Sequence, residues 1–580
     1  GNSISQIFQT NGESEFRKLE KKEIAKLGII SNKVISCGGG TVLDINNQKA
    51  ISNNSTVFWL FADASTILNR LGEAGDRPLL MAADSNGRKM KIEKLLESRM
   101  PDYARAANAI VDTRGKTPKQ IAERICNETG IMDANKTDED PDNEKSGKDS
   151  DGEVIEVESA HIYGEITAPP SKSMMVRAVA ASILSDGESI ISNPSFCDDG
   201  LAAIGIAKVL GASVEERGGC VAIAGIGNPA SAKNANRGRL ILDCVESGLC
   251  IRMFSPISAL RAEETALVAS GSLAKRQIKQ VEQLAEMGAK CATNNGYAPV
   301  LIKGPVHAGK IRADGSQSSQ FITGLLMALP LCKSDSEIII ENPKSAPYLG
   351  MTIEMLGKYG ISISKRKWTN GKKAEISYSI KGNQKYKACN YHVEGDWSGA
   401  SFMLVAGAIA GRVKLTGLDA DSQQGDKRIM DALTAAGADV RIKGGSVETR
   451  ATKLRAFEFD ATDCPDLFPP LVALACNCEG TSNVKGVNRL REKESDRASA
   501  LADEFAKMGA KIKIDGDCME IDGRKLHGAE VDSHNDHRIA MACAVASLNC
   551  NGIVKIRGWK CASKSYPGFF EDLEQVKKGW

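Results

Sequence analysis

Residues 501–512 read LADEFAKMGAKI, a pattern that decides the fold because it recurs along the chain. Apolar residues at helical spacing lead to a glycine that typically ends a helix, and a strand-like run follows. Related stretches stand at 205–215 (GIAKVLGASVE) and 281–291 (VEQLAEMGAKC). The closing glycines are Gly211, Gly288, Gly360, Gly437 and Gly509, with spacings of 77, 72, 77 and 72 residues.

A sixth copy is divided between two places. Residues 569–580, FFEDLEQVKKGW, put Gly579 at a distance of 70 residues from Gly509. The strand-like run that should follow stands instead at 153–166, EVIEVESAHIYGEI. Residues 153–580 are therefore predicted to hold six copies of one α/β unit. Since a repeated scaffold is structural, polar residues that interrupt the repeat are the better candidates for function.

Each unit also contains a second helix with few charges along its body. These helices are predicted to start near Ser173, Ser247, Ser318, Ser398, Pro465 and Asn535. Helices that are apolar on most sides are buried, whereas the glycine-ended helices carry one charged face and should lie outside. The predicted architecture is a set of sheets packed around buried helices, in two halves of three units.

The composition is that of a globular protein. At 580 residues the chain has room for about three or four domains. A net charge of +2 gives no electrostatic reason to bind nucleic acid or an anionic membrane. The 16 cysteines contain no CxxC pair, which favours reduced thiols in a cytoplasmic protein. We therefore expect small-molecule partners, with neither a nucleic acid nor a membrane among them.

A polar segment divides the chain into two blocks. Residues 127–153 have almost no apolar side chains, so we expect a disordered acidic linker. Residues 1–126 precede it and residues 154–580 follow it. The chain begins with Gly1 inside a helix-like stretch, which we interpret as the mark of processing or of a fragment.

Basic residues gather where the buried helices are predicted to begin, and in the loops between units. A helix N-terminus attracts anions, and arginine offers a planar fork for carboxylate or phosphate. A cation there opposes the helix dipole, so several together indicate a cleft for a multiply anionic ligand; solvated surface is the alternative. The residues are Lys172, Arg177, Arg252, Arg538, Arg276, Lys493, Arg497 and Lys564.

Three local signals each allow a second interpretation. The run RLREKESDR at 489–497 could be a solvated helix start. Asp466 precedes an apolar helix and could be a simple N-cap. His534 and His537 stand three residues apart, but no third ligand accompanies them, so we favour an orienting role for His537 and predict no metal site.

Seven motifs in residues 154–580 resemble those of the 5-enolpyruvylshikimate-3-phosphate (EPSP) synthase family. In chain order they read PPSKSMMVRAVAASIL, DGSQSSQFITGLLMALPL, VEGDWSGASF, DCPDLFPPLVALA, RLREKESDR, NDHRIAMA and WKCASKSYPGFFEDL. This family has an inside-out α/β barrel of two three-unit domains, between which the chain crosses twice. The resemblance implies one domain near 172–391 and another formed by 154–171 and 392–580.

The resemblance implies transfer of the enolpyruvyl group of phosphoenolpyruvate to the 5-hydroxyl of shikimate 3-phosphate, with release of phosphate. This reaction belongs to chorismate and aromatic amino acid biosynthesis and needs no cofactor. We expect a monomer. One alternative is UDP-N-acetylglucosamine enolpyruvyl transferase, which shares the fold and phosphoenolpyruvate. Another is a non-catalytic scaffold, which would have no use for an acid–base pair.

The family motifs also assign roles to residues of this chain. Asp466 matches the proton acceptor at the 5-hydroxyl, Glu494 matches the group that protonates the methylene carbon, and Lys172 faces phosphoenolpyruvate. An acid at that place needs a pKa raised towards neutrality. The implied shikimate 3-phosphate residues are Lys172, Ser173, Arg177, Ser318, Ser319, Gln320, Ser345, Asp466 and Lys493. The implied phosphoenolpyruvate residues are Lys172, Gly248, Arg276, Gln320, Arg497, Arg538 and Lys564.

Two positions depart from the family pattern. The usual Asn-Ala-Gly-Thr loop reads Glu246-Ser247-Gly248-Leu249 here, although the glycine and the later Arg252 fit. The usual asparagine ahead of the Lys-Glu pair is Arg489. We therefore expect contacts at these two places to differ from those of the family.

Residues 1–126 resemble the body of a shikimate kinase, a P-loop-kinase-type α/β domain. The motifs are NGESEFRKLE, VISCGGGTV, NSTVFWLFADAS, RPLL, SRMPDY and VDTRGKTPKQIAERI. By resemblance shikimate contacts Arg17, Gly38, Gly39, Gly40 and Arg99, and Arg77 lies in a lid over ATP. No GxxxxGK[ST] P-loop occurs in this block, so it reads as N-terminally truncated.

Two hypotheses follow for the kinase-like block. In the first, the natural chain is longer and bifunctional, with ATP and Mg²⁺ bound once the missing residues complete the kinase. In the second, the block is a remnant that only folds or binds. For the chain as printed we predict no ATP-dependent phosphorylation of shikimate.

Overall fold

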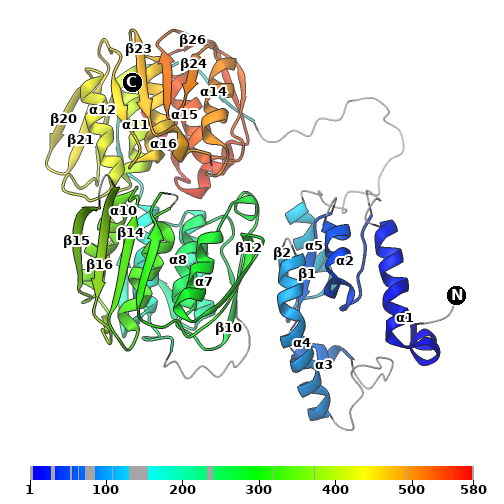
Figure 1. Cartoon of the computed structure of the whole chain (residues 1–580). Coiled ribbons are helices and arrows are strands. Elements are labelled where there is room, and N and C mark those ends of the chain that lie inside the picture. Colours follow the sequence, from blue (N-terminus) through cyan, green and yellow to red (C-terminus); the bar gives the residue numbers. More distant parts are fainter. Residues whose placement is uncertain are drawn as a thin grey trace, which may run out of the picture.

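The structure is a computed structural model, shown whole in Figure 1. It describes residues 4–27, 33–52, 55–62, 64–71, 85–107, 109–129, 154–230, 240–316, 318–370, 373–491 and 493–577. Arg77, Gly579 and nearly all of the expected linker lie outside these residues. Helix α5 (Pro118–Thr129) includes residues 127–129, which are the first three residues of the expected linker.

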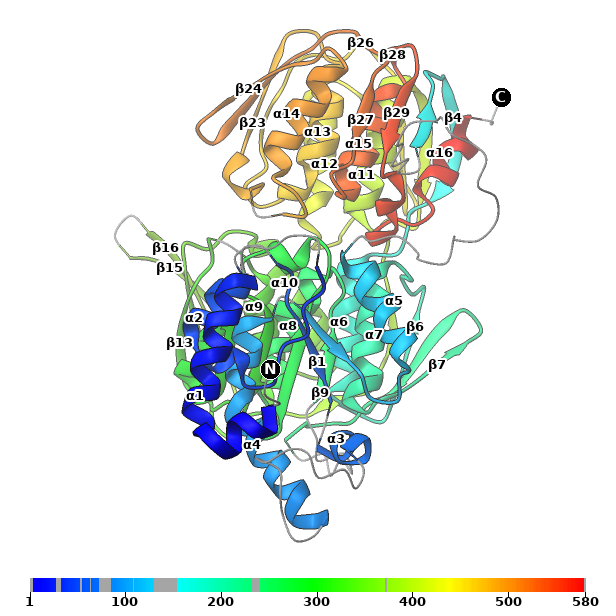
Figure 2. The ribbon, with the colours of Figure 1, turned by 90° about the vertical axis from the view of Figure 1, so that its right-hand side faces the viewer.

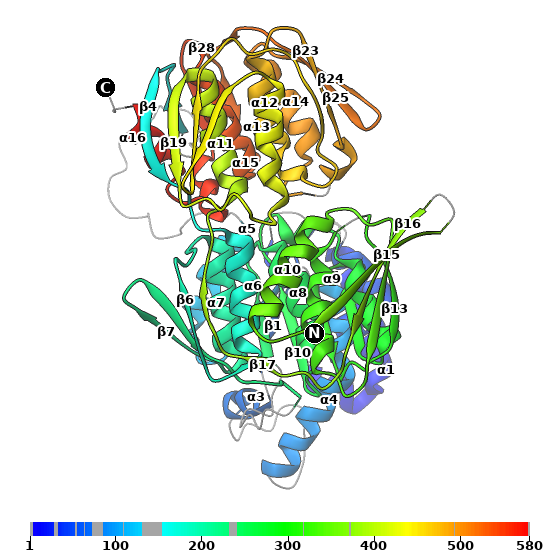
Figure 3. The same cartoon turned by 90° about the vertical axis from the view of Figure 1, so that its left-hand side faces the viewer.

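The larger part of the chain forms two stacked domains, the lower and upper domains of Figures 1 and 3. The lower domain has three four-stranded sheets. The first has the order β18 (Asn390–His392), β6 (Glu188–Ser192), β8 (Cys220–Ala224), β7 (Ser213–Arg217). The second is β11 (Lys290–Asn294), β12 (Tyr297–Lys303), β10 (Glu264–Val268), β9 (Leu240–Asp243). The third is β13 (Lys310–Asp314), β14 (Ser336–Glu341), β16 (Lys373–Ile380), β15 (Ile363–Asn370).

The upper domain repeats this plan. Its sheets are β20 (Asp439–Lys443), β21 (Ser446–Arg450), β19 (Gly411–Thr416), β4 (Ile162–Thr167), and β22 (Glu458–Asp460), β23 (Thr481–Lys485), β25 (Cys518–Asp522), β24 (Lys511–Asp515). The third is β27 (Glu530–Asp532), β29 (Val554–Arg557), β3 (Val154–Val157). The run 153–166, expected to complete the sixth unit, forms two strands. The first, β3, pairs antiparallel with β29, whereas the second, β4, pairs parallel with β19 in another sheet.

Two sets of helices fill and cover these sheets. The inner set is α6 (Lys172–Ile183), α8 (Gly248–Ser258), α9 (Gln320–Ala328), α11 (Trp397–Ala410), α13 (Phe468–Cys476) and α15 (His537–Ser547). The glycine-ended set is α7 (Asp198–Leu210), η4 (Lys279–Met287), α10 (Ala346–Lys358), α12 (Ile429–Ala435), α14 (Arg497–Lys507) and α16 (Phe569–Lys577). Every residue of α8, α11, α13 and α15 is buried, as the small number of charges along these helices predicts.

The recurring glycine has the conformation that its place requires. Gly211, Gly288, Gly360, Gly437 and Gly509 have φ angles of 105°, 87°, 80°, 83° and 88°. A residue with a Cβ is strained in this left-handed region, whereas glycine enters it freely and lets the chain leave the helix. One detail differs from expectation, because the second of these helices, η4, is a 3₁₀ helix.

Two adjacent chain segments join the domains. One runs from β4 in the upper domain to α6 in the lower domain, and the other runs from β18 to α11. They are hydrogen-bonded to each other, since Ser171 N donates to Glu394 O at 2.9 Å and Asp396 N donates to Pro169 O at 2.7 Å. Two large apolar clusters, one in each domain, form the cores on either side of this crossing.

The N-terminal block packs against the lower domain (Figure 2). It contains α1 (Ile4–Leu27), η1 (Thr41–Leu43), α2 (Ile45–Ser52), α3 (Ala64–Leu71), α4 (Ser85–Ala106) and α5, with β1 (Phe58–Phe61) parallel to β2 (Ala109–Asp112). Phe61 and Ile110 share an apolar cluster with Ala266, Val268 and Leu301 of β10 and β12. Among the described residues, no helix is both long and apolar enough to cross a membrane.

Candidate active site

A cleft lies between the two domains, and the starts of the inner helices surround it. Lys172 begins α6, Gly248 begins α8, Gln320 begins α9, and Arg538 is the second residue of α15. Asp466 lies in the short η7 helix (Pro465–Leu467) just before α13. The repeat therefore points several helix N-termini, each with its unpaired N–H groups, at one space.

Most residues predicted from the sequence for the synthase site meet in this cleft. They are Lys172, Ser173, Arg177, Gly248, Arg276, Ser318, Ser319, Gln320, Ser345, Asp466, Lys493, Glu494, Arg538 and Lys564. Sequence reasoning missed Asp199 and Tyr348, which also line the cleft. The lining is completed by residues noted for other reasons, namely Glu246, Leu249, Pro465, Arg489 and His537. Arg252 does not line it, because its guanidinium donates to Gln277 O at 2.7 Å inside the lower domain.

Asp466 accepts charge-assisted contacts from three cations. The Lys493 ammonium lies at 3.2 Å, Arg497 Nη1 at 3.0 Å and Arg538 Nη2 at 3.3 Å from its carboxylate. Burial alone would raise the pKa of Asp466, but Arg538, Lys493 and Arg497 together hold it well below the usual range. Asp466 is therefore ionised and fully engaged in the ligand-free cleft, and it is more than an N-cap.

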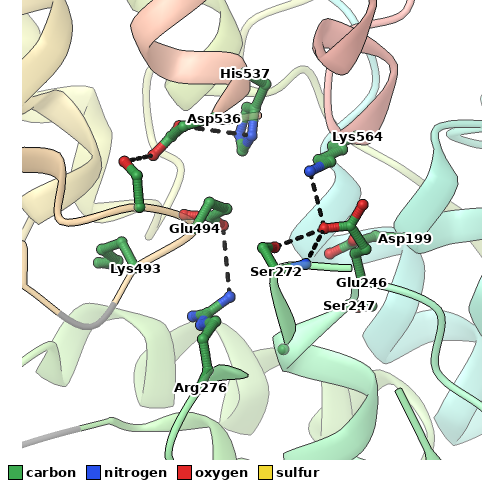
Figure 4. A network of polar contacts seen from close by, with 12 residues as sticks. Asp199, Glu246, Ser247, Ser272, Arg276, Lys493, Glu494, Asp536, His537 and Lys564 are labelled. Carbon is green, nitrogen blue, oxygen red and sulfur yellow. Dashed lines mark hydrogen bonds and ion pairs between the residues drawn. The ribbon is translucent and has the colours of Figure 1, made fainter. Parts of the chain in front are cut away.

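Glu494 contacts Arg497 as well, through the other terminal nitrogen of the guanidinium. Its carboxylate pairs with Arg497 Nη2 and lies 3.9 Å from Arg276 Nη1 (Figure 4). The expectation of a raised pKa for Glu494 is wrong in this structure. Burial raises the pKa of Glu494, but the charges of Arg497 and Arg276 outweigh burial and hold it well below the usual range.

Arg497 does not line the cleft but lies buried behind it, with 0% of its side chain exposed. Its Nε donates to Asp536 at 2.9 Å, and its two terminal nitrogens reach Asp466 and Glu494. One guanidinium thus holds three carboxylates. From this run, Arg489, Lys493 and Glu494 line the cleft, and the solvated-helix interpretation is wrong at Arg497, where α14 begins.

Lys172 and His537 complete the centre of the cleft. The Lys172 ammonium lies 3.1 Å from Asp199. Burial lowers the pKa of Lys172, but Asp199 and Glu494 outweigh it, so the pKa is raised and the ammonium is charged. Burial, with the charges of Arg538 and Lys172, depresses the pKa of His537, so its ring is neutral.

The two histidines do not form a metal pair. His534 Nε2 lies 2.7 Å from Glu504 Oε1, and neither residue lines the cleft. Neither ring nitrogen of His537 has a hydrogen-bond partner among the described residues, and Nδ1 lies 4.0 Å from Asp536. Nor does the described part of the chain contain a group of three or more His, Cys, Asp or Glu residues suited to a metal ion.

Comparison with known proteins agrees with this geometry. Residues 157–573 match the sequence profile of EPSP synthase (3-phosphoshikimate 1-carboxyvinyltransferase). The chain belongs to the EPSP synthase family. Relatives named 3-phosphoshikimate 1-carboxyvinyltransferase include those of Clostridium novyi, 39% identical over 440 residues, and Clostridium beijerinckii, 36% identical over 428 residues. Each alignment covers 73% of this chain and 97% of the relative.

Solved structures confirm the predicted inside-out barrel of the EPSP synthase family. The EPSP synthase of Acinetobacter baumannii matches with a TM-score of 0.61 and 26% identity, over 73% of this chain and 98% of that one. The enolpyruvyl transferase NikO of Streptomyces tendae matches with a TM-score of 0.58, and its 16% identity shows the fold alone. Residues 1–129 match the shikimate kinase profile.

Arg489, which departs from the EPSP synthase family pattern, reaches across the cleft. It belongs to the upper domain, yet its guanidinium donates to Ser316 O and, at 2.8 Å, to Ser345 Oγ in the lower domain. Ser345 has a left-handed backbone with φ 57°, and its N–H donates to Asp463 Oδ1 at 2.8 Å. Strained conformations of this kind cluster at functional sites. Arg489 thus adds a cation beside a serine predicted to hold the 3-phosphate.

The shikimate kinase-like block also brings its predicted residues together. Arg99 Nη1 lies 3.5 Å from Gly39 O, and Tyr103 OH donates to the same oxygen at 2.6 Å. The Arg17 guanidinium lies so close to Gly40 that a Cβ there would overlap it. Arg17, the three glycines and Arg99 therefore form one surface, while Arg77 lies outside the described residues.

Proposed function

We propose that this chain transfers the enolpyruvyl group of phosphoenolpyruvate to the 5-hydroxyl of shikimate 3-phosphate and releases phosphate. The observation that carries the proposal is the meeting of two carboxylates, Asp466 and Glu494, within one cleft of cations contributed by both domains. The names of the relatives support the same reaction. The cations suit two anionic substrates. The two carboxylates can take a proton from the hydroxyl of one substrate and give a proton to the vinyl carbon of the other.

The two carboxylates divide the proton chemistry. In the addition step the 5-hydroxyl gives its proton to Asp466 while its oxygen bonds to C2 of phosphoenolpyruvate. The double-bond electrons of phosphoenolpyruvate then take a proton from Glu494 at C3. In the elimination step C3 returns a proton to Glu494, the bond between C2 and the phosphate oxygen breaks, and the double bond forms again. The leaving phosphate takes the proton that Asp466 accepted. Lys172, Arg276 and Arg538 spread the charge of the intermediate.

Substrate binding should change the partners of these carboxylates. In the ligand-free cleft the cations predicted to hold phosphoenolpyruvate are paired with the protein's own acids, such as Arg276 with Glu494. An incoming anion that takes Arg276 and Arg538 leaves Glu494 and Asp466 with fewer positive neighbours. Their pKa values then rise, which gives Glu494 the proton that it needs as an acid.

Acceptor choice tests the proposal. The chain is mixed with phosphoenolpyruvate and either shikimate 3-phosphate or UDP-N-acetylglucosamine, and released phosphate is measured. We expect release with shikimate 3-phosphate only. Release with the nucleotide sugar alone would assign the rival transferase, and release with neither would mean that the cleft is inactive.

Arg489 should contribute to shikimate 3-phosphate binding. Because a charge-assisted hydrogen bond contributes about 1.5–3 kcal/mol, Arg489→Asn is expected to raise KM for shikimate 3-phosphate about 10-fold or more. KM for phosphoenolpyruvate should change little. The control is Arg491→Asn, because Arg491 is exposed and does not line the cleft. Equal KM values for the two variants would contradict the assignment.

We propose that the N-terminal block binds shikimate. The surface formed by Arg17, Gly39, Gly40 and Arg99 supports binding. The printed sequence has no P-loop in residues 1–129, so the residues present do not fit ATP or Mg²⁺. We assign no kinase step to them.

We propose further that the chain works in the cytoplasm as a monomer. All 16 cysteines are unpaired, which fits a reducing compartment.

A further inference from the structure

The backbone on both sides of the Glu246 side chain adopts conformations that accommodate its carboxylate. It precedes α8, and its neighbour Val245 has a left-handed φ of 49°, which is rare for a β-branched residue. Gly271 lies opposite, and a Cβ there would overlap the Glu246 carboxylate. A strained residue and a glycine on facing loops thus hold this side chain at the edge of the cleft.

The Glu246 carboxylate joins the two domains (Figure 4). Within the lower domain it accepts hydrogen bonds from Ser272 N at 2.8 Å and Ser272 Oγ at 2.6 Å. From the upper domain the Lys564 ammonium donates to it at 3.0 Å, and Asn535 Nδ2 lies at 3.4 Å. Lys564 is nearly buried, with 8% of its side chain exposed.

Glu246 stays ionised at neutral pH. Burial alone would raise its pKa, but the charge of Lys564 and the hydrogen bonds from Ser272 lower it. The cleft lining holds seven Lys or Arg residues and four carboxylates. Asp466 and Glu494 have proton-transfer roles in the proposed reaction, and Asp199 pairs with Lys172. Glu246 has no such role, and the EPSP synthase family usually has a neutral asparagine there.

We propose that Glu246 is a positioning residue that sets the affinity for phosphoenolpyruvate, because it is the internal counter-ion of Lys564 and competes with the substrate anion for that lysine. The inference rests on the proposed function. Each time phosphoenolpyruvate binds, Lys564 must turn from the carboxylate of Glu246 to the anion of the substrate, and Glu246 remains nearby as a repelling charge.

Lys564 does not depend on Glu246 for its location. Its ammonium also donates to Asn535 O at 2.8 Å, a backbone contact within the upper domain. A glutamine at 246 would keep an acceptor for Ser272 while it removes the negative charge. The neutral variant should therefore leave Lys564 in place and free it for substrate.

The test compares kinetic constants of wild type and Glu246→Gln. We expect KM for phosphoenolpyruvate to fall about tenfold or more, because a unit charge that repels the substrate anion close to Lys564 is removed. KM for shikimate 3-phosphate and kcat should stay within about twofold. Added salt should narrow the difference in KM, since it screens repulsion between Glu246 and the substrate. A purely structural role for Glu246 would not lower KM for phosphoenolpyruvate while it leaves kcat and the other KM unchanged.

Three further variants serve as controls. Asp198→Asn removes a carboxylate at the same domain boundary, where Ser563 Oγ donates to Asp198 at 2.8 Å, but Asp198 does not line the cleft. Its KM for phosphoenolpyruvate should be unchanged. Glu246→Asp keeps the charge and should retain the wild-type value. Glu246→Ala must show the same fall as Glu246→Gln, and it replaces that variant if the glutamine form does not fold.

The outcomes separate the two proposals. An inactive wild-type chain overturns the proposed function itself. An active wild type, with an unchanged or higher KM for phosphoenolpyruvate in folded Glu246→Gln, overturns the counter-ion role alone. A fall in KM for both substrates also overturns the counter-ion role, as does an equal fall in KM for phosphoenolpyruvate in Asp198→Asn. In either case the effect would not be specific to Lys564.

Discussion

Replacement of Glu494 by glutamine is expected to lower kcat about 100-fold or more, the usual contribution of a general acid. Glutamine has nearly the same shape and still accepts hydrogen bonds, but it has no proton to give to C3 of phosphoenolpyruvate. KM values should change less than kcat, because Glu494 acts in the transition state more than in the substrate complex. Steady-state phosphate release, at saturating concentrations of both substrates, measures the loss.

Asp503→Asn is the matched control for Glu494→Gln. Asp503 is an exposed acid on α14, the helix that follows Glu494, and it does not line the cleft. Its kcat should equal that of wild type. If Glu494→Gln, with an unaltered circular dichroism spectrum, turns over at a rate near wild type, Glu494 is not the acid.

The second large effect concerns stability. Arg497→Met is expected to lower the free energy of unfolding of the upper domain by about 3–5 kcal/mol, because it leaves buried carboxylates without their cation. Asp536 is the most affected, since both its oxygens accept from Arg497 and its side chain is 0% exposed. Thermal or denaturant unfolding, followed by circular dichroism and with the domain transitions resolved, measures the change.

A surface arginine supplies the comparison for Arg497. Arg217 pairs with Glu188 and Glu215, but 54% of its side chain is exposed. Arg217→Met should therefore change stability much less than Arg497→Met does, because solvent screens an exposed ion pair. Similar losses from the two substitutions would mean that burial of the Arg497 network does not determine its energetic importance.

Repetition explains why the architecture could be predicted from the sequence. A helix that ends at glycine needs only local information, and five such glycines with the same left-handed backbone mark units that are equivalent in space. Uncharged helices such as α11 and α13 could be assigned to the interior from composition alone. The 3₁₀ form of η4 was not predictable, because its sequence has the same periodicity as its α-helical counterparts.

Site composition was predictable, but charge pairing was not. Motifs placed Asp466, Glu494 and most cations at the cleft. They gave no warning that Glu494 has a lowered pKa, because the charges of Arg497 and Arg276 reach its carboxylate only once the side chains are placed by folding. Asp199 and Tyr348 were missed for a similar reason. Both lie in helices predicted only as structural, and only folding brings them to the cleft.

The paired crossing of the chain limits how the two halves of the cleft can move. A single connecting segment would leave one domain free to twist about it, whereas two segments bonded at Ser171–Glu394 and Pro169–Asp396 leave one main axis of rotation. Opening should then be a rotation about the two connecting segments. Each closure should return Lys564 and Arg538 to the same positions relative to Lys172 and Arg276. The backbone of the two connecting segments thus aligns the two halves of the cleft before any substrate binds.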